Sequence, residues 1–104
     1  MQFSVYKNKN PKIKIAYPYF VDVQSDLLRD LQTRVVIPVT KLAAHDKKPL
    51  KHLTPIVDIG SQRFLLLTPQ LAGVASKDLG SPIASVAQFR TEIVAALNFL
   101  IAGI

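Results

Sequence analysis

The chain has 104 residues, of which 49% are hydrophobic, and this predicts one globular domain spanning residues 1–104 rather than a disordered segment. The absence of cysteine excludes a disulfide framework and a thiolate metal site. The formal net charge is +6, and ten of the thirteen basic residues lie within residues 1–52. Nucleic acid, an acidic protein and plain solvent are all candidate partners of that basic half.

The first part of the chain predicts short strands around a basic loop. Phe3 and Val5 alternate with polar neighbours, which is typical of a half-buried strand. Residues 7–12 have the composition of a loop, residues 13–17 alternate again, and residues 20–23 predict a short buried strand.

Two adjacent leucines, Leu27 and Leu28, then stand in a polar segment where Ser25 can cap a single helical turn. Such a pair usually packs back on the core, and the alternative is an exposed apolar knob. The next strand is predicted at residues 33–39, with Pro38 limiting its far end to a sheet edge or a bulge.

The second half predicts further strands after a basic loop at residues 41–53. A tight hairpin at Gly60 joins two of them. These strands are predicted at residues 54–59 and 63–68, with a further short one at 71–75.

The last predicted element is a helix from about Pro82 to Ile101, where Ser85 and Gln88 have the spacing of a capping box. Its end is apolar nearly all round, so we expect the domain itself, a second copy or a foreign partner to bury it. Its apolar run is about a dozen residues, where a membrane span needs about 20. A buried stripe is predicted at Val86, Phe89, Ile93, Leu97, Leu100, Ile101 and Ile104.

Together these elements predict a mainly β fold, a small and largely antiparallel barrel or sheet with the C-terminal helix packed across it. The first residues have the pattern of a strand and not of a signal peptide. We therefore expect a cytoplasmic protein.

Residues able to carry metal or acid–base chemistry are present but not organised. His45 and His52 flank Asp46 without the spacing of a metal-ligand signature, so no metal site is predicted. The acids Asp22, Asp26 and Asp30 are spaced along a strand and a loop, and we expect them not to converge.

A metal-independent ribonuclease remains chemically possible. Arg34, His52 and Asp58 have the residue types for it, although their positions give no support, and Asp58 is expected to face outward from its strand.

Six segments resemble, in order and over essentially the whole chain, the CcdB family of toxin–antitoxin toxins. They are MQFSVYKN, YFVDVQSDLL, RVVIP, TPIVDIG, RFLLLT and ALNFLIAGI. The resemblance implies an SH3-like antiparallel barrel with a C-terminal helix, shared with the MazF and Kid toxins, and a homodimer with its two C-terminal helices side by side. It also implies a non-enzymatic poison of DNA gyrase, of a class associated with plasmid maintenance, which binds the gyrase A subunit, traps cleaved DNA and is neutralised by a CcdA-type antitoxin.

The resemblance assigns sites without any cofactor, metal, membrane or sequence-specific nucleic-acid contact. Two other functions stay open, a ribonuclease toxin on the related barrel and a non-toxic relic that binds antitoxin. The family's best-known pattern has tryptophan where this chain has Ala102. The implied gyrase-binding residues are Gln2, Phe3, Ser25, Leu27, Asn98, Ala102, Gly103 and Ile104, and the implied antitoxin-binding residues are Lys7, Lys9, Lys12, Lys47, Lys48 and Lys51.

Overall fold

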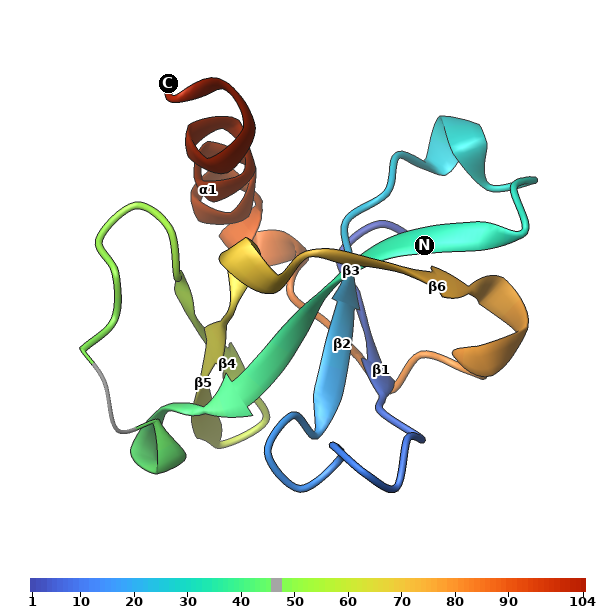
Figure 1. Cartoon of the computed structure of the whole chain (residues 1–104), viewed down its shortest axis with the longest axis horizontal. Helices are drawn as coiled ribbons and strands as arrows, with labels where there is room; N and C mark the ends of the chain where they lie inside the picture. The colour runs from blue at the N-terminus through green and yellow to red at the C-terminus, as the bar shows by residue number, and fades with distance from the viewer. Residues whose placement is uncertain (46–47) are drawn as a thin grey trace.

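The computed structural model describes residues 1–45 and 48–104. Seven strands in this part of the chain form one antiparallel sheet that curls into a nearly closed barrel, with a helix at the C-terminal end (Figure 1). The mainly β prediction is therefore confirmed. The strands are β1 (Ser4–Lys7), β2 (Tyr19–Asp22), β3 (Thr33–Lys41), β4 (Ile56–Ile59), β5 (Gln62–Leu66), β6 (Ala72–Ala75) and β7 (Ala84–Ser85), and the helix is α1 (Arg90–Ala102).

The strand order is β4-β5-β3-β2-β1-β7, so β4 and β7 are its two ends, and β6 pairs with β3 beside this path. The long central strand β3 pairs with β2 along one side. On the other side its first half pairs with β6 and its last residues pair with β5. Three of these pairings join consecutive strands, whereas β3–β5, β3–β6 and β1–β7 join strands that lie farther apart in the chain.

Pro38 is buried in the middle of β3, so the prediction that it limits the strand to an edge or a bulge is wrong. Its carbonyl oxygen accepts a hydrogen bond from the Leu67 N–H at 2.9 Å. The N–H and C=O of one strand residue point to the same side of the strand, so the N–H that Pro38 lacks would also point to the edge of β3 that faces β6 and β5. At Pro38 this edge has no ladder partner, because pairing with β6 ends at Val36 and pairing with β5 begins at Val39. The proline therefore removes no ladder hydrogen bond.

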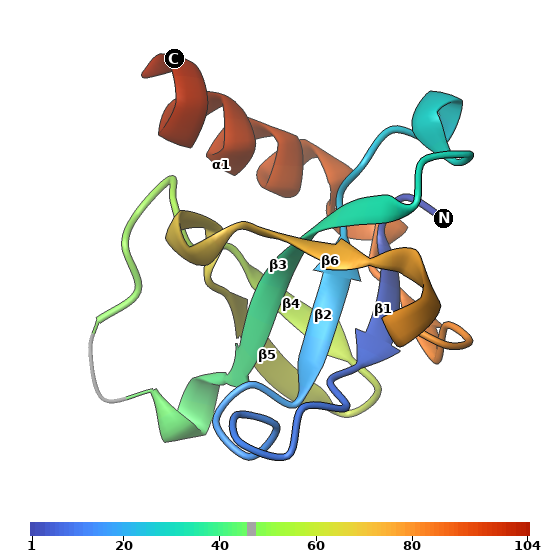
Figure 2. The same ribbon diagram turned by 45° about the vertical axis from the view of Figure 1, so that its right-hand side comes forward.

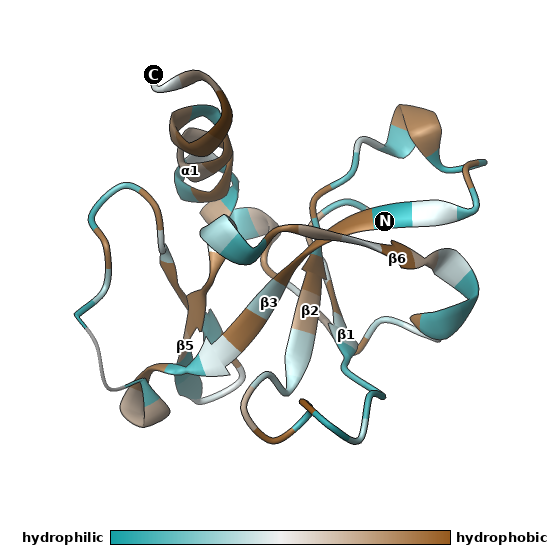
Figure 3. Cartoon of the chain, in the orientation of Figure 1, coloured by the Kyte–Doolittle hydropathy of each residue, from teal (hydrophilic) through white to brown (hydrophobic). Residues whose placement is uncertain are grey.

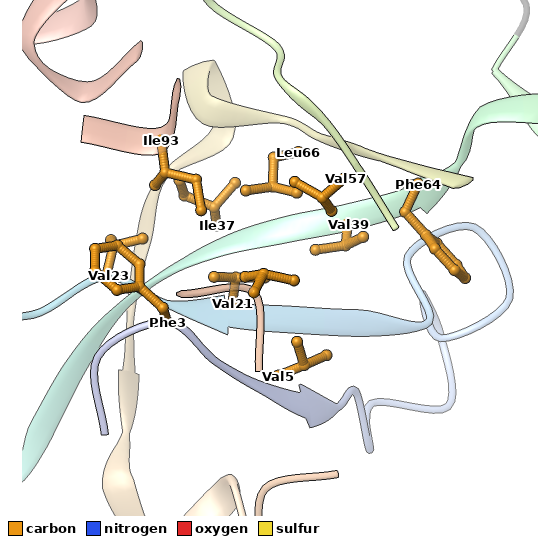
Figure 4. Close-up of a cluster of buried hydrophobic side chains, with 11 residues drawn as sticks. Phe3, Val5, Val21, Val23, Ile37, Val39, Val57, Phe64, Leu66 and Ile93 are labelled. Atoms are coloured by element: carbon orange, nitrogen blue, oxygen red, sulfur yellow. The ribbon is translucent and has the colours of Figure 1, made fainter. Parts of the chain in front are cut away.

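The sheet is covered on both faces. The main core collects valines from β1, β2 and β3 with Phe64 of β5 and Ile93 of α1 (Figure 4). A smaller cluster of Tyr6, Val36 and Leu79 lies apart from it. The consecutive residues Ser4, Val5 and Tyr6 of β1 are all buried, so the predicted alternation of buried and exposed side chains in this strand is wrong.

Residues 82–86 extend the sheet instead of beginning the helix, so the predicted start at Pro82 is wrong. The Ile83 N–H donates to the Val5 carbonyl at 2.8 Å, and the Val86 N–H donates to the Phe3 carbonyl at 2.9 Å. Strand pairing thus satisfies backbone groups that a first helical turn would leave unpaired. The Ser85 hydroxyl accepts from the Ala87 N–H, and a 3₁₀ turn (Ala87–Phe89) leads into α1.

Helix α1 is buried only along its first half. Ile93 and Ala96 are buried and Leu97 is partly buried. Beyond them the helix leaves the barrel, and the C-terminus lies at its far end (Figure 2). The predicted buried stripe therefore stops near Leu97, and its last three members, Leu100, Ile101 and Ile104, are exposed.

The structure decides three predictions about the segments between strands. Residues 13–17 form turns rather than a strand, with the Tyr17 N–H donating to the Ile13 carbonyl. Leu27 and Leu28 are exposed, so the apolar knob is the correct alternative. The predicted hairpin is confirmed, because Gly60 has φ 63° in the two-residue turn between the paired Ile59 and Gln62.

A stability prediction follows from Thr68, which is fully buried and whose Oγ1 has no hydrogen-bond partner among the described residues. An unpaired buried hydroxyl costs about 1–3 kcal/mol, and valine has nearly the same shape. Thr68→Val should raise the free energy of unfolding in urea by about 1 kcal/mol. Thr54→Val is the matched control, because the Thr54 Oγ1 accepts from the Leu50 N–H at 2.7 Å. The control should lower stability, and equal losses in both variants would contradict the expectation.

Candidate functional site

The N-terminal segment and the turn after β2 are joined by hydrogen bonds. The Gln2 N–H donates to Asp26 Oδ1 at 2.9 Å, and Gln2 Nε2 donates to the Val23 carbonyl at 3.2 Å. The Ser25 hydroxyl accepts from the Leu27 N–H and begins a 3₁₀ turn (Asp26–Leu28), as the sequence predicts. Four predicted gyrase contacts, Gln2, Phe3, Ser25 and Leu27, are thereby brought into one region.

Within this region the side chains differ in accessibility. Leu27 is 91% exposed, whereas Phe3 is 3% exposed and belongs to the core. Phe3 has φ 67°, a left-handed conformation that is uncommon for a bulky residue. The Arg90 guanidinium lies 5.4 Å from the centre of its ring. Leu27 is therefore the most exposed large apolar side chain of this region, and Leu28 beside it is about half exposed.

A buried charge cluster lies beneath the same region. Asp22 is fully buried, and its Oδ2 accepts from Arg34 Nε at 2.9 Å and from Arg34 Nη2 at 2.6 Å. Asp26 Oδ1 lies 4.0 Å from Arg34 Nη2. The prediction that the three acids do not converge is thus wrong for two of them, while Asp30 is exposed.

The other predicted gyrase contacts gather at the far end of α1. Asn98, Ala102, Gly103 and Ile104 are all exposed. Gly103 has φ 74° and its N–H donates to the Phe99 carbonyl at 3.1 Å, which ends the helix with a left-handed cap. Apolar residues surround this end (Figure 3). The large exposed ones are Phe99, Leu100, Ile101 at 74% and Ile104 at 89%.

The two groups of contacts do not meet within one chain. Helix α1 has 13 residues, a rise of about 20 Å, and the Leu27 turn lies toward the start of the helix. Both ribbon views place the two chain ends well apart (Figures 1 and 2). A partner that contacts both groups must span this distance or contact two copies of the chain.

The lysines predicted to bind antitoxin lie on two loops. Lys7 ends β1, Lys9 and Lys12 follow in the β1–β2 loop, and Lys48 and Lys51 lie between β3 and β4; all five are exposed. Lys47 lies outside the described residues. The two loops flank one hollow of about 500 Å³, lined by Tyr17 from the first loop and by His45, Lys48 and Leu50 from the second, among others.

The residues considered for ribonuclease chemistry are held in three separate environments. Arg34 is paired with Asp22 inside the protein. The His52 ring packs against the Phe99 ring with 6.0 Å between centres. Asp58 faces outward, as predicted, with its Oδ1 3.8 Å from Arg63 Nε. The described residues therefore do not assemble these three groups into one site.

The residues that the structure covers contain neither a group of metal ligands nor a helix that could cross a membrane. No group of three or more histidine, aspartate or glutamate side chains there is arranged to hold a metal ion. No helix in residues 1–45 and 48–104 has the length and apolar character required to cross a membrane.

Comparison with protein-family models gives a match over nearly the whole chain. The family model described as CcdB protein matches residues 2–103. This range includes the seven strands of the described residues, helix α1 and the predicted gyrase contacts except Ile104.

Proposed function

Because the chain belongs to the CcdB family, whose members are toxin–antitoxin toxins that act on gyrase, we propose that it binds the A subunit of DNA gyrase and traps the cleaved-DNA complex. It acts as a poison in the cytoplasm and performs no chemistry of its own. A CcdA-type antitoxin neutralises it.

The exposed apolar end of α1 carries this proposal. Ile101 and Ile104 are largely in solvent, and Phe99 and Leu100 are partly so. Contiguous exposed apolar surface of this kind is typical of a protein–protein interaction site. Asn98 adds a polar group to the same end, which suits a partner interface with a few oriented hydrogen bonds.

The proposal includes a homodimer with the two α1 helices side by side. In an isologous pair each copy presents the same patch, so both helix ends lie on one continuous surface. This arrangement supports binding because it buries part of the exposed apolar end and leaves the terminal residues Ala102–Ile104 for gyrase. Within one copy, Leu27 and the C-terminal residues lie far apart. A dimer presents two of each to a partner.

The basic loops are the proposed antitoxin site. Lys7, Lys9 and Lys12 take part in none of the salt bridges formed among the described residues, so their positive charges are available to an acidic partner. An acidic antitoxin segment would approach under long-range attraction. The hollow between the two loops offers apolar contact at Tyr17 and Leu50.

A cleavage assay tests the function directly. Purified protein is incubated with gyrase, supercoiled plasmid and ATP, and the mixture is then treated with detergent and protease. We expect linear DNA that depends on the protein. In parallel, total RNA is incubated with the protein without metal; specific RNA cleavage with no linear DNA would overturn the proposal in favour of a ribonuclease.

A growth assay separates a toxin from an antitoxin-binding relic, an alternative favoured by the small Ala102 side chain at the exposed helix end. The chain is expressed in cells with wild-type gyrase and in cells with a poison-resistant gyrase. We expect growth arrest in the first strain alone. Equal growth of both strains at full expression would support the relic.

Substitution of Ala102 is expected to increase affinity. Tryptophan buries roughly 150–250 Å² at an interface, far more than alanine. Ala102→Trp should therefore tighten binding to the purified A subunit by about tenfold or more, equivalent to about 1.4 kcal/mol. The control is Ala43→Trp, at an exposed alanine in the turn Leu42–Ala44. Calorimetry showing no gain, or the same gain from the control, would contradict this expectation.

A further inference from the structure

The buried Asp22–Arg34 ion pair belongs to neither predicted set of contacts, and we propose that it positions the gyrase-binding residues Gln2 and Leu27. This inference rests on the proposed function for the identity of the partner. Neither charged side chain reaches the surface in appreciable area. Both are therefore positioning residues that act through the segments attached to them.

The carboxylate of Asp22 is fully used within the fold. Its Oδ2 takes both Arg34 hydrogen bonds, and its Oδ1 accepts from the Gln24 N–H at 2.9 Å. The α-amino group of Met1 also lies 3.3 Å from Oδ2. Asp22 thus fixes the start of the turn that carries Leu27.

The same residue holds the N-terminal segment. The Asp22 carbonyl accepts from the Phe3 N–H at 2.6 Å, and this bond accompanies the left-handed backbone at Phe3. That unusual conformation persists only where surrounding contacts over-determine it. Gln2, the next residue toward the N-terminus, donates to Asp26.

Arg34 is the charge that allows the two acids to lie together. Asp22 and Asp26 both approach its Nη2 atom, at 2.6 and 4.0 Å. Without the guanidinium these carboxylates would repel each other, and Asp26 would be driven away from Gln2. Gln24 ties the turn to β3 as well, because its side chain accepts from the Val35 N–H and donates to the Leu28 carbonyl.

A buried ion pair is a poor way to gain stability, because desolvation of the charges offsets their attraction. Well-packed apolar residues of similar size often replace such a pair without loss of stability. What the apolar replacement cannot supply is the directional bonding to Gln24 and the charge opposite Asp26. Stability and positioning can therefore be separated by experiment.

The test is the double variant Asp22→Leu with Arg34→Met, compared with the exposed pair replaced in Asp58→Leu with Arg63→Met. Circular dichroism and thermal unfolding monitor the fold. Calorimetry with the purified gyrase A subunit measures Kd. Amide hydrogen exchange is followed at Phe3 and Leu28, whose N–H groups donate to the backbone carbonyls of Asp22 and Ser25 and keep these acceptors in the variant.

We expect the double variant to remain folded, its Kd for the A subunit to rise about tenfold or more, and exchange at Phe3 and Leu28 to accelerate by a similar factor. The exposed-pair control should leave all three measurements unchanged. A folded double variant with wild-type Kd and wild-type exchange overturns the inference.

Two further arms keep the result decisive. If the double variant does not fold, Asp26→Ala takes its place, because that side chain is about half exposed and its loss removes the acceptor of Gln2 and the 4.0 Å contact with Arg34 while the Asp22–Arg34 pair stays. It should raise Kd several-fold, and an unchanged Kd overturns the inference. If the wild-type chain does not bind the A subunit, the proposed function fails, while the exchange rates still decide whether the ion pair orders the two segments.

Discussion

Truncation of the chain after Ile101 is expected to reduce trapping of the gyrase–DNA cleavage complex by about 100-fold or more. Residues at the centre of an interface carry most of its binding energy, and loss of such a residue costs about 2–4 kcal/mol or more. The removed residues Ala102, Gly103 and Ile104 are exposed and contribute no buried side chain to the barrel. The effect should therefore fall on binding, measured as linear DNA over a titration of the protein.

The stability and the dimer fraction of the truncated protein serve as the control. The removed segment supplies the hydrogen bond from the Gly103 N–H to the Phe99 carbonyl, so only the last helical turn should fray. Thermal unfolding and the dimer fraction in analytical ultracentrifugation should stay close to wild type. Undiminished DNA cleavage by a folded, truncated protein would show that gyrase is contacted elsewhere.

The largest effect on stability is expected from Ile93→Ala, which should lower the free energy of unfolding by about 2–5 kcal/mol. Ile93 is fully buried against the main core, and with Ala96 it holds α1 on the barrel. Removing its side chain leaves a cavity at the attachment of the helix. Denaturant unfolding measures the loss, and amide exchange along α1 should accelerate first.

The matched substitution is Ile15→Ala, because Ile15 is 92% exposed in the β1–β2 loop. It deletes the same atoms from a site with little packing, and we expect a change below about 0.5 kcal/mol. Similar losses in the two variants would mean that α1 is not attached through Ile93.

The strands β3, β4 and β5 were predictable because their signal is local. Alternation and β-branched residues identify the segments containing β3, β4 and β5, and glycine identifies the hairpin at Gly60. The start of α1 was not predictable in this way. Ser85 and Pro82 are good helix-start residues, but they lie beside β1, and pairing with that distant strand overrides the local preference.

The charge cluster was missed for a related reason. Asp22 ends an apolar strand and Arg34 lies near the start of another, which in retrospect is a signal for a buried pair. Their contact depends on the β2–β3 register, in which Asp22 is opposite Val36, and a pattern within one segment does not give that register. The apolar character of the helix end was evident in the sequence, but the predicted burial of Leu100, Ile101 and Ile104 is wrong within one chain, because α1 extends beyond the barrel there.

The two ends of the strand order bear on how this protein avoids aggregation. An edge strand with unpaired backbone groups is a template for further strands from other molecules. Here β7 is only two residues long and Pro82 precedes it, while β4 follows Pro55 and presents the charged Asp58 outward. Short length, proline and charge all discourage strand addition at these two ends of the sheet.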